Sequence, residues 1–182
     1  MLSETDYFNN TELPNYYKDK KLIKFKGFKN NGKPEGLCII GNLDYDYYYF
    51  YEEVIFINNK KKGPYKKYYD NGILHEEGIY ENDLKNGPYK RHIDKKIYEE
   101  GIYKNDFKNG PYKLYDINGN IEEEGIYENY KKNGPYKRYY DNGNIWEEGI
   151  YENYKKNGPY KIYDYNSNII EEGIYENDKK MK

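Results

Sequence analysis

Few side chains in this 182-residue sequence could carry chemistry, and their spacing does not assemble a catalytic or metal site. The only histidines, His75 and His92, lie in separate copies of a repeated pattern, without further ligands at the fixed spacing that a zinc site needs. Ser167 has no base placed beside it, so a nucleophile is not expected. The single Cys38 excludes an internal disulfide and a cysteine-based metal site. We therefore expect a non-enzymatic protein that uses no cofactor and no metal.

Paired glutamates such as Glu147 and Glu148 are the remaining candidates for acid–base chemistry. In a strand, however, successive side chains point to opposite faces, so the two carboxylates of a pair cannot act together. Most of these glutamates also have a basic residue opposite them in the strand pairing described below. The sequence therefore predicts a ladder of surface ion pairs, each of which adds little to stability.

These glutamates belong to a motif, Glu-Glu-Gly-Ile-Tyr, that occurs five times at steps of 23 or 24 residues. A second motif, Gly-Pro-Tyr-Lys, recurs with the same period and begins at Gly63, Gly87, Gly110, Gly134 and Gly158. Periods of roughly 20–50 residues indicate a repeat protein, and such arrays usually work as extended binding surfaces. We assign a structural role to the glycines of the first motif, which are Gly78, Gly101, Gly125, Gly149 and Gly173.

Each repeat has the pattern of a β-hairpin. In the copy over 134–157, Asn142-Gly143 lies between two runs rich in Tyr and Ile, and Asn-Gly favours a tight turn because both residues tolerate a positive φ. We expect a strand, this tight turn, a second strand and a looser loop. The predicted fold is all-β: an elongated, twisted, single-layer antiparallel β-meander built of 24-residue hairpin repeats.

Counting outward from the Asn-Gly turn predicts the register of each hairpin. An aromatic ring then lies opposite a glycine, and opposite charges face one another, which stabilises an antiparallel pair by ~0.2–1 kcal/mol for each contact. Columns of Tyr and Gly share one face, and isoleucines share the other with the charged ladder. The predicted pairs are Tyr136–Gly149, Lys137–Glu148, Arg138–Glu147, Tyr65–Gly78, Lys66–Glu77, Tyr112–Gly125, Lys113–Glu124, Tyr160–Gly173 and Lys161–Glu172.

The repeat pattern also predicts how the chain is divided. Residues 1–20 fit no repeat and are expected to form a lead or a cap. Residues 21–62 read as divergent copies, and residues 63–182 as five near-identical repeats. These five span 63–86, 87–109, 110–133, 134–157 and 158–182.

The tyrosine columns have two interpretations. In the first, the rings are a scaffold that packs over glycine in place of a conventional core. In the second, they form a platform for a protein partner, because Tyr and Trp are favoured at the energetic centres of interfaces. Trp146 interrupts the repeat identity and is expected opposite Tyr139, just as His75 is expected opposite Tyr68. The residues predicted to bind a partner are Trp146, Tyr139, Tyr136, Tyr151, Tyr112 and Tyr127.

The combination of these motifs resembles the variant MORN repeat of bacteria. It is carried by Gly149-Ile150-Tyr151-Glu152-Asn153, by Lys156-Asn157-Gly158, and by 134–140 followed by Asn142-Gly143. The resemblance covers 63–182 well and 21–62 weakly. It implies a hairpin in a long antiparallel sheet and a role in protein–protein contacts. Some members of the family are antitoxin or immunity partners of bacterial toxins.

We therefore expect a non-enzymatic scaffold that binds an unidentified protein through its sheet face, with an antitoxin that neutralises a cognate toxin as the narrower alternative. The formal net charge of −2 argues against nucleic acid as the partner. Lysine-rich loops such as Lys60–Lys62 raise anionic lipid as a weaker alternative, and the tyrosine–glycine hairpins raise carbohydrate. Open sheet edges allow self-association. The N-terminus lacks a signal-peptide pattern, so a cytoplasmic location is expected.

Overall fold

The computed structural model describes residues 3–5, 22–30, 33–44, 48–69 and 71–181. All regular secondary structure in these residues is β, which confirms the predicted all-β antiparallel meander of hairpins. The chain divides into two compact units, the N-terminal unit Met1–Lys95 and the C-terminal unit Lys96–Lys182. This division does not coincide with the boundary expected at 62/63, and the proposed domain limits stay predictions.

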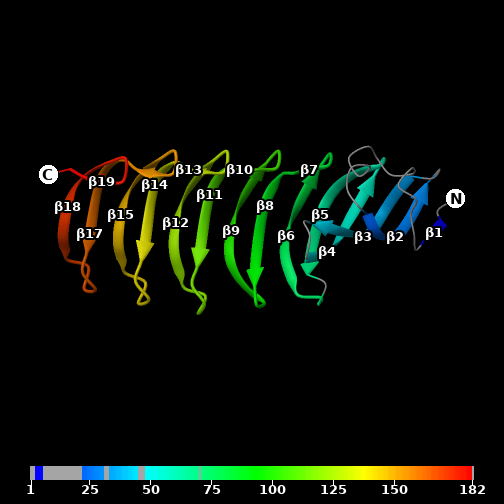
Figure 1. Cartoon of the computed structure of the whole chain (residues 1–182), viewed down its shortest axis with the longest axis horizontal. Coiled ribbons are helices and arrows are strands. Elements are labelled where there is room, and N and C mark those ends of the chain that lie inside the picture. Colours follow the sequence, from blue (N-terminus) through cyan, green and yellow to red (C-terminus); the bar gives the residue numbers. More distant parts are fainter. Residues whose placement is uncertain (1–2, 6–21, 31–32, 45–47, 70, 182) are drawn as a thin grey trace. The chain divides into compact units, whose positions relative to one another are not determined.

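In the N-terminal unit, the long strands pair with one another in chain order, each antiparallel to the one before (Figure 1). The short β1 pairs with β2 and is the only described part of the segment expected to form a lead or cap. The strands are β1 (Ser3–Thr5), β2 (Leu22–Asn30), β3 (Lys33–Asp44), β4 (Tyr48–Ile57), β5 (Lys60–Tyr69), β6 (Leu74–Glu81), β7 (Leu84–Lys85) and β8 (Gly87–Ile93).

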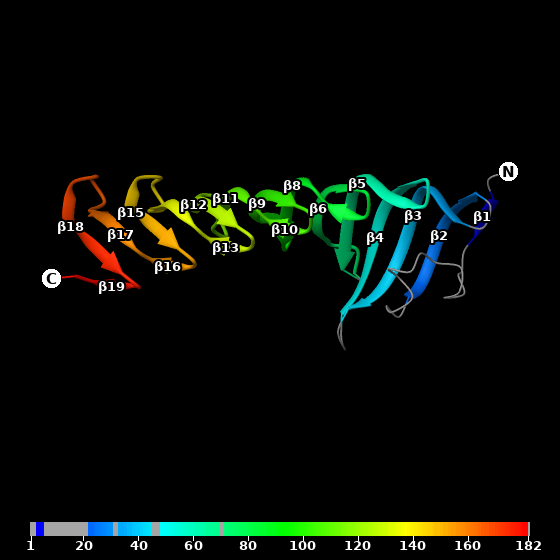
Figure 2. The ribbon, with the colours of Figure 1, turned by 90° about the horizontal axis from the view of Figure 1, so that it is seen from above.

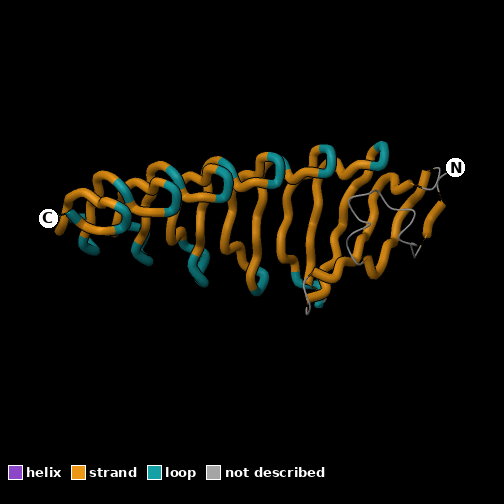
Figure 3. The backbone as a smooth tube through the Cα atoms, turned by 45° about the horizontal axis from the view of Figure 1, so that its top comes forward, coloured by secondary structure: helices purple, strands orange, loops and turns teal. Residues whose placement is uncertain are grey.

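The C-terminal unit repeats one pattern: a strand, a turn, a second strand, a two-residue turn and a two-residue strand. Its strands follow one another in chain order (Figure 2), and its turns gather along two edges (Figure 3). The strands are β9 (Lys96–Lys104), β10 (Phe107–Lys108), β11 (Gly110–Tyr115), β12 (Ile121–Glu128), β13 (Lys131–Lys132), β14 (Gly134–Tyr139), β15 (Ile145–Glu152), β16 (Lys155–Lys156), β17 (Gly158–Tyr163), β18 (Ile169–Glu176) and β19 (Lys179–Lys180).

The register predicted from the Asn-Gly turns is confirmed. In the hairpin of β14 and β15, Tyr136 pairs with Gly149 and Lys137 pairs with Glu148, and Arg138 is opposite Glu147. The equivalent pairs predicted around Asn71, Asn118 and Asn166 are also present. The predicted and observed registers agree because the charge pairs and the ring-over-glycine contacts specify the same alignment of the two strands.

The assignment of turn types was wrong. At the Asn-Gly site only Gly143 has a positive φ, of 84°, and the bonds Gly143 N–Tyr140 O (3.0 Å) and Tyr140 N–Asn144 O (2.8 Å) close a type I turn with a glycine bulge. The tight two-residue turn is the connection expected to be loose. There, Asn153 and Tyr154 both have a positive φ, of 50° and 74°, as a type I′ turn requires.

The core of each unit lies within the sheet. Tyr136 is 2% exposed, its ring centroid is 4.3 Å from that of Tyr151, and it covers the backbone at Gly149. A Cβ added at Gly149 would be 3.1 Å from the Tyr136 ring and from its hydroxyl, so any side chain there would require the ring to shift. The same stack recurs with Tyr112 on Tyr127 and, in the N-terminal unit, with other tyrosines.

Candidate protein-binding surface

The first glutamate of the Glu-Glu pair is buried in the first four repeats, which contradicts the surface ladder predicted for it, whereas the side chain of Glu171 in the last repeat is 43% exposed. Glu147 is 1% exposed and accepts hydrogen bonds from the Tyr136 hydroxyl (2.9 Å) and the Lys156 ammonium (2.7 Å). The Nη1 of Arg138 lies 3.7 Å from the same carboxylate. A buried charge is stable only when it is paired and hydrogen-bonded, so this network holds each repeat together. In the other repeats Glu76, Glu99 and Glu123 are buried and pair with Lys85, Lys108 and Lys132; in the segment before the repeats, Glu52 is buried and pairs with Lys61 of β5.

The partner lysines come from the two-residue strands after the type I′ turns. Pairing of β16 with β15 sets Lys156 opposite Tyr151, and its ammonium lies 5.1 Å from the centroid of the Tyr175 ring. The lysine-rich loops therefore do not act as one basic edge: Lys156 is turned inward, whereas its neighbour Lys155 is exposed. The sequence held a signal for this contact, because each such lysine follows its glutamate by nine residues.

The inward network also shifts the pKa values of its members. Burial raises the pKa of Glu123, but hydrogen bonds from Lys132, Tyr112 and Arg138 outweigh burial, and the net pKa is lowered. Burial and the adjacent carboxylate raise the pKa of Tyr112. Glu123 therefore stays charged and Tyr112 stays protonated, which is the state that the hydrogen bond between them needs.

Four of the six residues predicted to bind a partner belong to this network or stack on it. Tyr112 and Tyr136 are 2% exposed and Tyr151 is 7% exposed, and Tyr127 is stacked on Tyr112 at 4.2 Å. Burial leaves them little surface to offer, and their contacts support the scaffold interpretation of the tyrosine columns. Their partner-binding role stays an untested prediction.

Trp146 and Tyr139 lie nearer the turn and are half-buried. A bulge at the end of β14 pairs Tyr139 with Ile145, so the prediction that Trp146 lies directly opposite Tyr139 was wrong. The Trp146 ring instead lies 5.7 Å from the guanidinium of Arg138, while the Tyr139 hydroxyl donates to Glu124 (2.5 Å). These two residues remain accessible enough to contribute to a surface.

The same bulge in the N-terminal unit pairs Tyr68 with Leu74, so His75 does not lie opposite Tyr68 as predicted. The His75 ring packs 4.8 Å from that of Tyr69. Burial and the nearby Arg91 lower the pKa of His75 to about 4. The part of the chain that the structure describes holds no cluster of His, Cys, Asp or Glu suited to a metal ion.

The face opposite the tyrosine columns exposes apolar side chains in a regular row. Cross-strand pairing sets Pro135 beside Ile150 and Pro159 beside Ile174, and the two isoleucines are 38% and 57% exposed. We call this row the Pro–Ile face. In the C-terminal unit it consists of Pro111, Ile126, Pro135, Ile150, Pro159 and Ile174.

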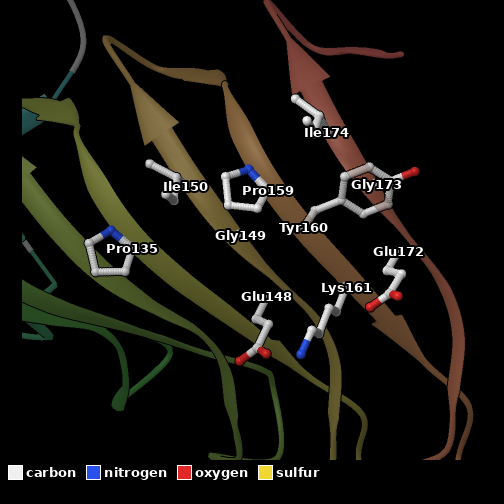
Figure 4. Close-up of a pocket in the computed structure, with 10 residues that line it drawn as sticks. All are labelled: Pro135, Glu148, Gly149, Ile150, Pro159, Tyr160, Lys161, Glu172, Gly173 and Ile174. Atoms are coloured by element: carbon white, nitrogen blue, oxygen red, sulfur yellow. The ribbon is translucent and has the colours of Figure 1, made fainter. Parts of the chain in front are cut away.

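An open groove of about 560 Å³ crosses the Pro–Ile face between neighbouring hairpins (Figure 4). Its apolar wall is formed by the prolines and isoleucines of strands β14, β15, β17 and β18. At one end, Lys161 lies between Glu148 and Glu172, with which it pairs across the strands. A similar groove of about 230 Å³, lined by Pro64, Ile79 and Pro88, occurs in the N-terminal unit, so the feature arises from the repeat itself.

The second glutamate of a pair borders this face, and in several repeats a tyrosine hydroxyl holds it in place. Glu148 accepts a hydrogen bond from the Tyr163 hydroxyl (2.7 Å), and Glu100 accepts one from Tyr115 (2.7 Å). The bond to Glu148 raises the pKa of Tyr163 to about 12. An ordered charged row beside an exposed apolar row is the composition of a binding surface with an apolar centre and a polar rim.

No family model matches the sequence, and no curated protein is similar to it, so membership of the MORN family stays a prediction. Among the described residues, the structure has no helix with the length and hydrophobicity needed to cross a bilayer.

Proposed function

We propose that the chain is a non-enzymatic scaffold that binds a protein partner through its Pro–Ile face. The observation that carries the proposal is which side chains are exposed on the two faces of the sheet. The tyrosines that usually mark interfaces are buried in the sheet, whereas isoleucines such as Ile150 and Ile174 are exposed at the same position of successive repeats. Apolar rows of this kind, rimmed by charged residues, mark protein interaction sites.

The charge pattern supports a protein in preference to nucleic acid or lipid. Lysine and glutamate alternate along the row beside the groove, as in Lys137, Glu148 and Lys161. Such alternation offers no excess positive charge for phosphates, which would need a basic face. An antitoxin that covers its toxin is a special case of this function and depends on the identity of the partner.

Affinity capture with matched variants tests the proposal. The double variant Ile150→Lys and Ile174→Lys puts charge on the Pro–Ile face, while the lysine stems still cover the backbone beneath them. Ile117→Lys is the control, because Ile117 is 82% exposed at a turn tip away from the groove. We expect one stoichiometric partner from cell lysate with the natural chain and with Ile117→Lys, and none with the double variant. Equal recovery with all three proteins would refute the proposal.

A further inference from the structure

A row of exposed aromatic rings follows the edge of the C-terminal unit at which the type I′ turns lie. Phe107, Tyr130 and Tyr154 are 48%, 43% and 51% exposed, and the first two pack with ring centroids 5.5 Å apart. We call these three residues the aromatic edge. It lies at the ends of the strands and does not include the residues that line the groove of the Pro–Ile face.

The two tyrosines occupy a backbone conformation that suits them poorly. Tyr130 and Tyr154 have φ values of 69° and 74°, a region in which a bulky side chain is an outlier. Other repeats have aspartate at the same turn position, where it tolerates a positive φ more readily. Asp178 also accepts a hydrogen bond from the Lys156 amide (2.7 Å), as Asp83 does from the Lys61 amide (2.8 Å). Two turns thus carry a less favourable residue, and such strain points to function.

The rings are fixed in place before any partner arrives. The Tyr154 hydroxyl donates to the carbonyl oxygen of Tyr130, and the Tyr130 hydroxyl donates to that of Asp106. The rings of Tyr130 and Tyr154 are therefore each tied to the preceding turn. A surface held in this way loses little conformational entropy on binding.

The spacing between Tyr130 and Tyr154 restricts the class of ligand that could contact both rings. Successive repeats are two strands apart, or about 9.6 Å, since neighbouring strands lie ~4.8 Å apart. A polyproline II helix has three residues per turn and rises ~3.1 Å per residue, which gives about 9.3 Å per turn. Prolines three residues apart would consequently meet Tyr130 and Tyr154, as in the aromatic-lined grooves that bind proline-rich segments, while Phe107 packs on Tyr130 and enlarges the first contact.

The charged residues beside the tyrosines indicate which charge the bound segment should carry. Lys131 and Lys155 follow the two tyrosines directly and are exposed, one per repeat. The carboxylates of Glu128 and Glu152 accept hydrogen bonds from the side-chain amides of Asn133 and Asn157, which directly precede β14 and β17. The backbone of a polyproline II segment makes no internal hydrogen bonds, so its carbonyl groups can accept from these lysines. An acidic residue between the prolines would add an ion pair at each repeat.

We propose that the aromatic edge binds a proline-rich, acidic segment of a partner protein in the polyproline II conformation. The site differs from the Pro–Ile face, and either proposal can fail without the other.

Fluorescence anisotropy with the full-length chain tests this site. The probe is a labelled peptide of four Pro-Pro-Glu units, and its control is a peptide of four Gly-Ser-Glu units, which has the same length and charge but no prolines to hold the polyproline II conformation. The double variant Tyr130→Asp and Tyr154→Asp restores the residue that other repeats use. Tyr165→Asp is the matched control, since Tyr165 is also an exposed tyrosine (50%) but lies at an Asn-Ser turn.

We expect the natural chain and Tyr165→Asp to bind the periodic peptide and to prefer it to the control peptide. The double aspartate variant should bind it about tenfold more weakly or worse, the loss that two aromatic contacts represent. Its melting temperature should stay the same or rise, because the turn strain is relieved. Equal binding of both peptides, undiminished binding by the double variant, or a loss of binding with a lower melting temperature would overturn the proposal.

Discussion

Replacing the glycine beneath a buried tyrosine should destabilise the sheet in a way that the structure makes quantitative. A Cβ at Gly149 would lie 3.1 Å from the Tyr136 ring, whereas ordinary contacts begin at about 3.4 Å. The ring cannot easily move away, because it is stacked on Tyr151 and its hydroxyl is bonded to Glu147. Gly149→Val adds two further methyl groups to this crowded site. Overpacking of this kind costs ~1–3 kcal/mol.

Thermal unfolding measures this cost. For a chain of this size, 1 kcal/mol corresponds to ~2–4 °C in melting temperature, so Gly149→Val should melt about 2–12 °C below the natural protein. Gly149→Ala should fall in the same direction but less far, because the gain of ~0.5–1 kcal/mol from replacing glycine in a strand offsets part of the clash.

A double-mutant cycle in the last repeat identifies the cause. Gly173 has the same 3.1 Å approach to Tyr160, and the side chain of Glu171 there is 43% exposed, so removing the tyrosine leaves no buried carboxylate. Gly173→Val should destabilise the natural protein and be nearly neutral in a Tyr160→Ala background. An unchanged melting temperature for Gly149→Val, or equal effects of Gly173→Val in both backgrounds, would refute the ring-over-glycine packing.

Three further predictions concern single residues. Lys156→Met should lower the free energy of unfolding by about 2–4 kcal/mol, because Glu147 would stay buried with only the more distant Arg138 as its cation, whereas Lys155→Met should change it by less than about 0.5 kcal/mol; urea titration separates the two. The pKa of His75 is lowered from 6.5 to about 4, so the stability that it contributes is complete above pH 6.5 and is lost as the pH falls toward 4. We expect a loss of about 1–2 kcal/mol over this window after allowance for solvent, and a His75→Gln variant that lacks this part of the pH profile. Ser167→Gly should raise the melting temperature by a few degrees, about 0.5–1 kcal/mol, because Ser167 has a φ of 68°; a lower melting temperature would contradict this explanation.

The hairpin register could be predicted from the sequence because it is specified by pairs of residues that lie close together in the chain. Lys137 with Glu148 and Tyr136 with Gly149 favour the same alignment, and each repeat gives an independent copy of the information. The turn types could not be assigned in the same way. Asn-Gly suits both a type I′ turn and the αL position of a bulged type I turn, so the dipeptide alone does not decide between them. The bulge of the type I turn also shifts the pairing by one residue, so Tyr139 lies opposite Ile145 and not opposite Trp146.

The buried carboxylates were missed for a different reason. Glutamate is almost never fully buried without a partner, so a charged ladder is ordinarily assigned to the surface. The burial of Glu147 depends on Lys156, which reaches it only because the type I′ turn at Asn153 and Tyr154 folds β16 back onto β15. A loose loop at this position, as predicted from the sequence, would leave Lys156 in solvent and away from Glu147. The exposed Pro–Ile face follows from the same geometry, because the tyrosines cover the other side.

Site-specific photo-crosslinking tests the role of the Pro–Ile face most directly. A photoreactive amino acid at position 150 lies in the groove, and one at position 117 lies at a turn tip outside it. After irradiation in cells, we expect a single crosslinked product from position 150 and none from position 117, with the mass of the partner recovered by affinity capture. No product from position 150, or the same product from both positions, would contradict binding through this face.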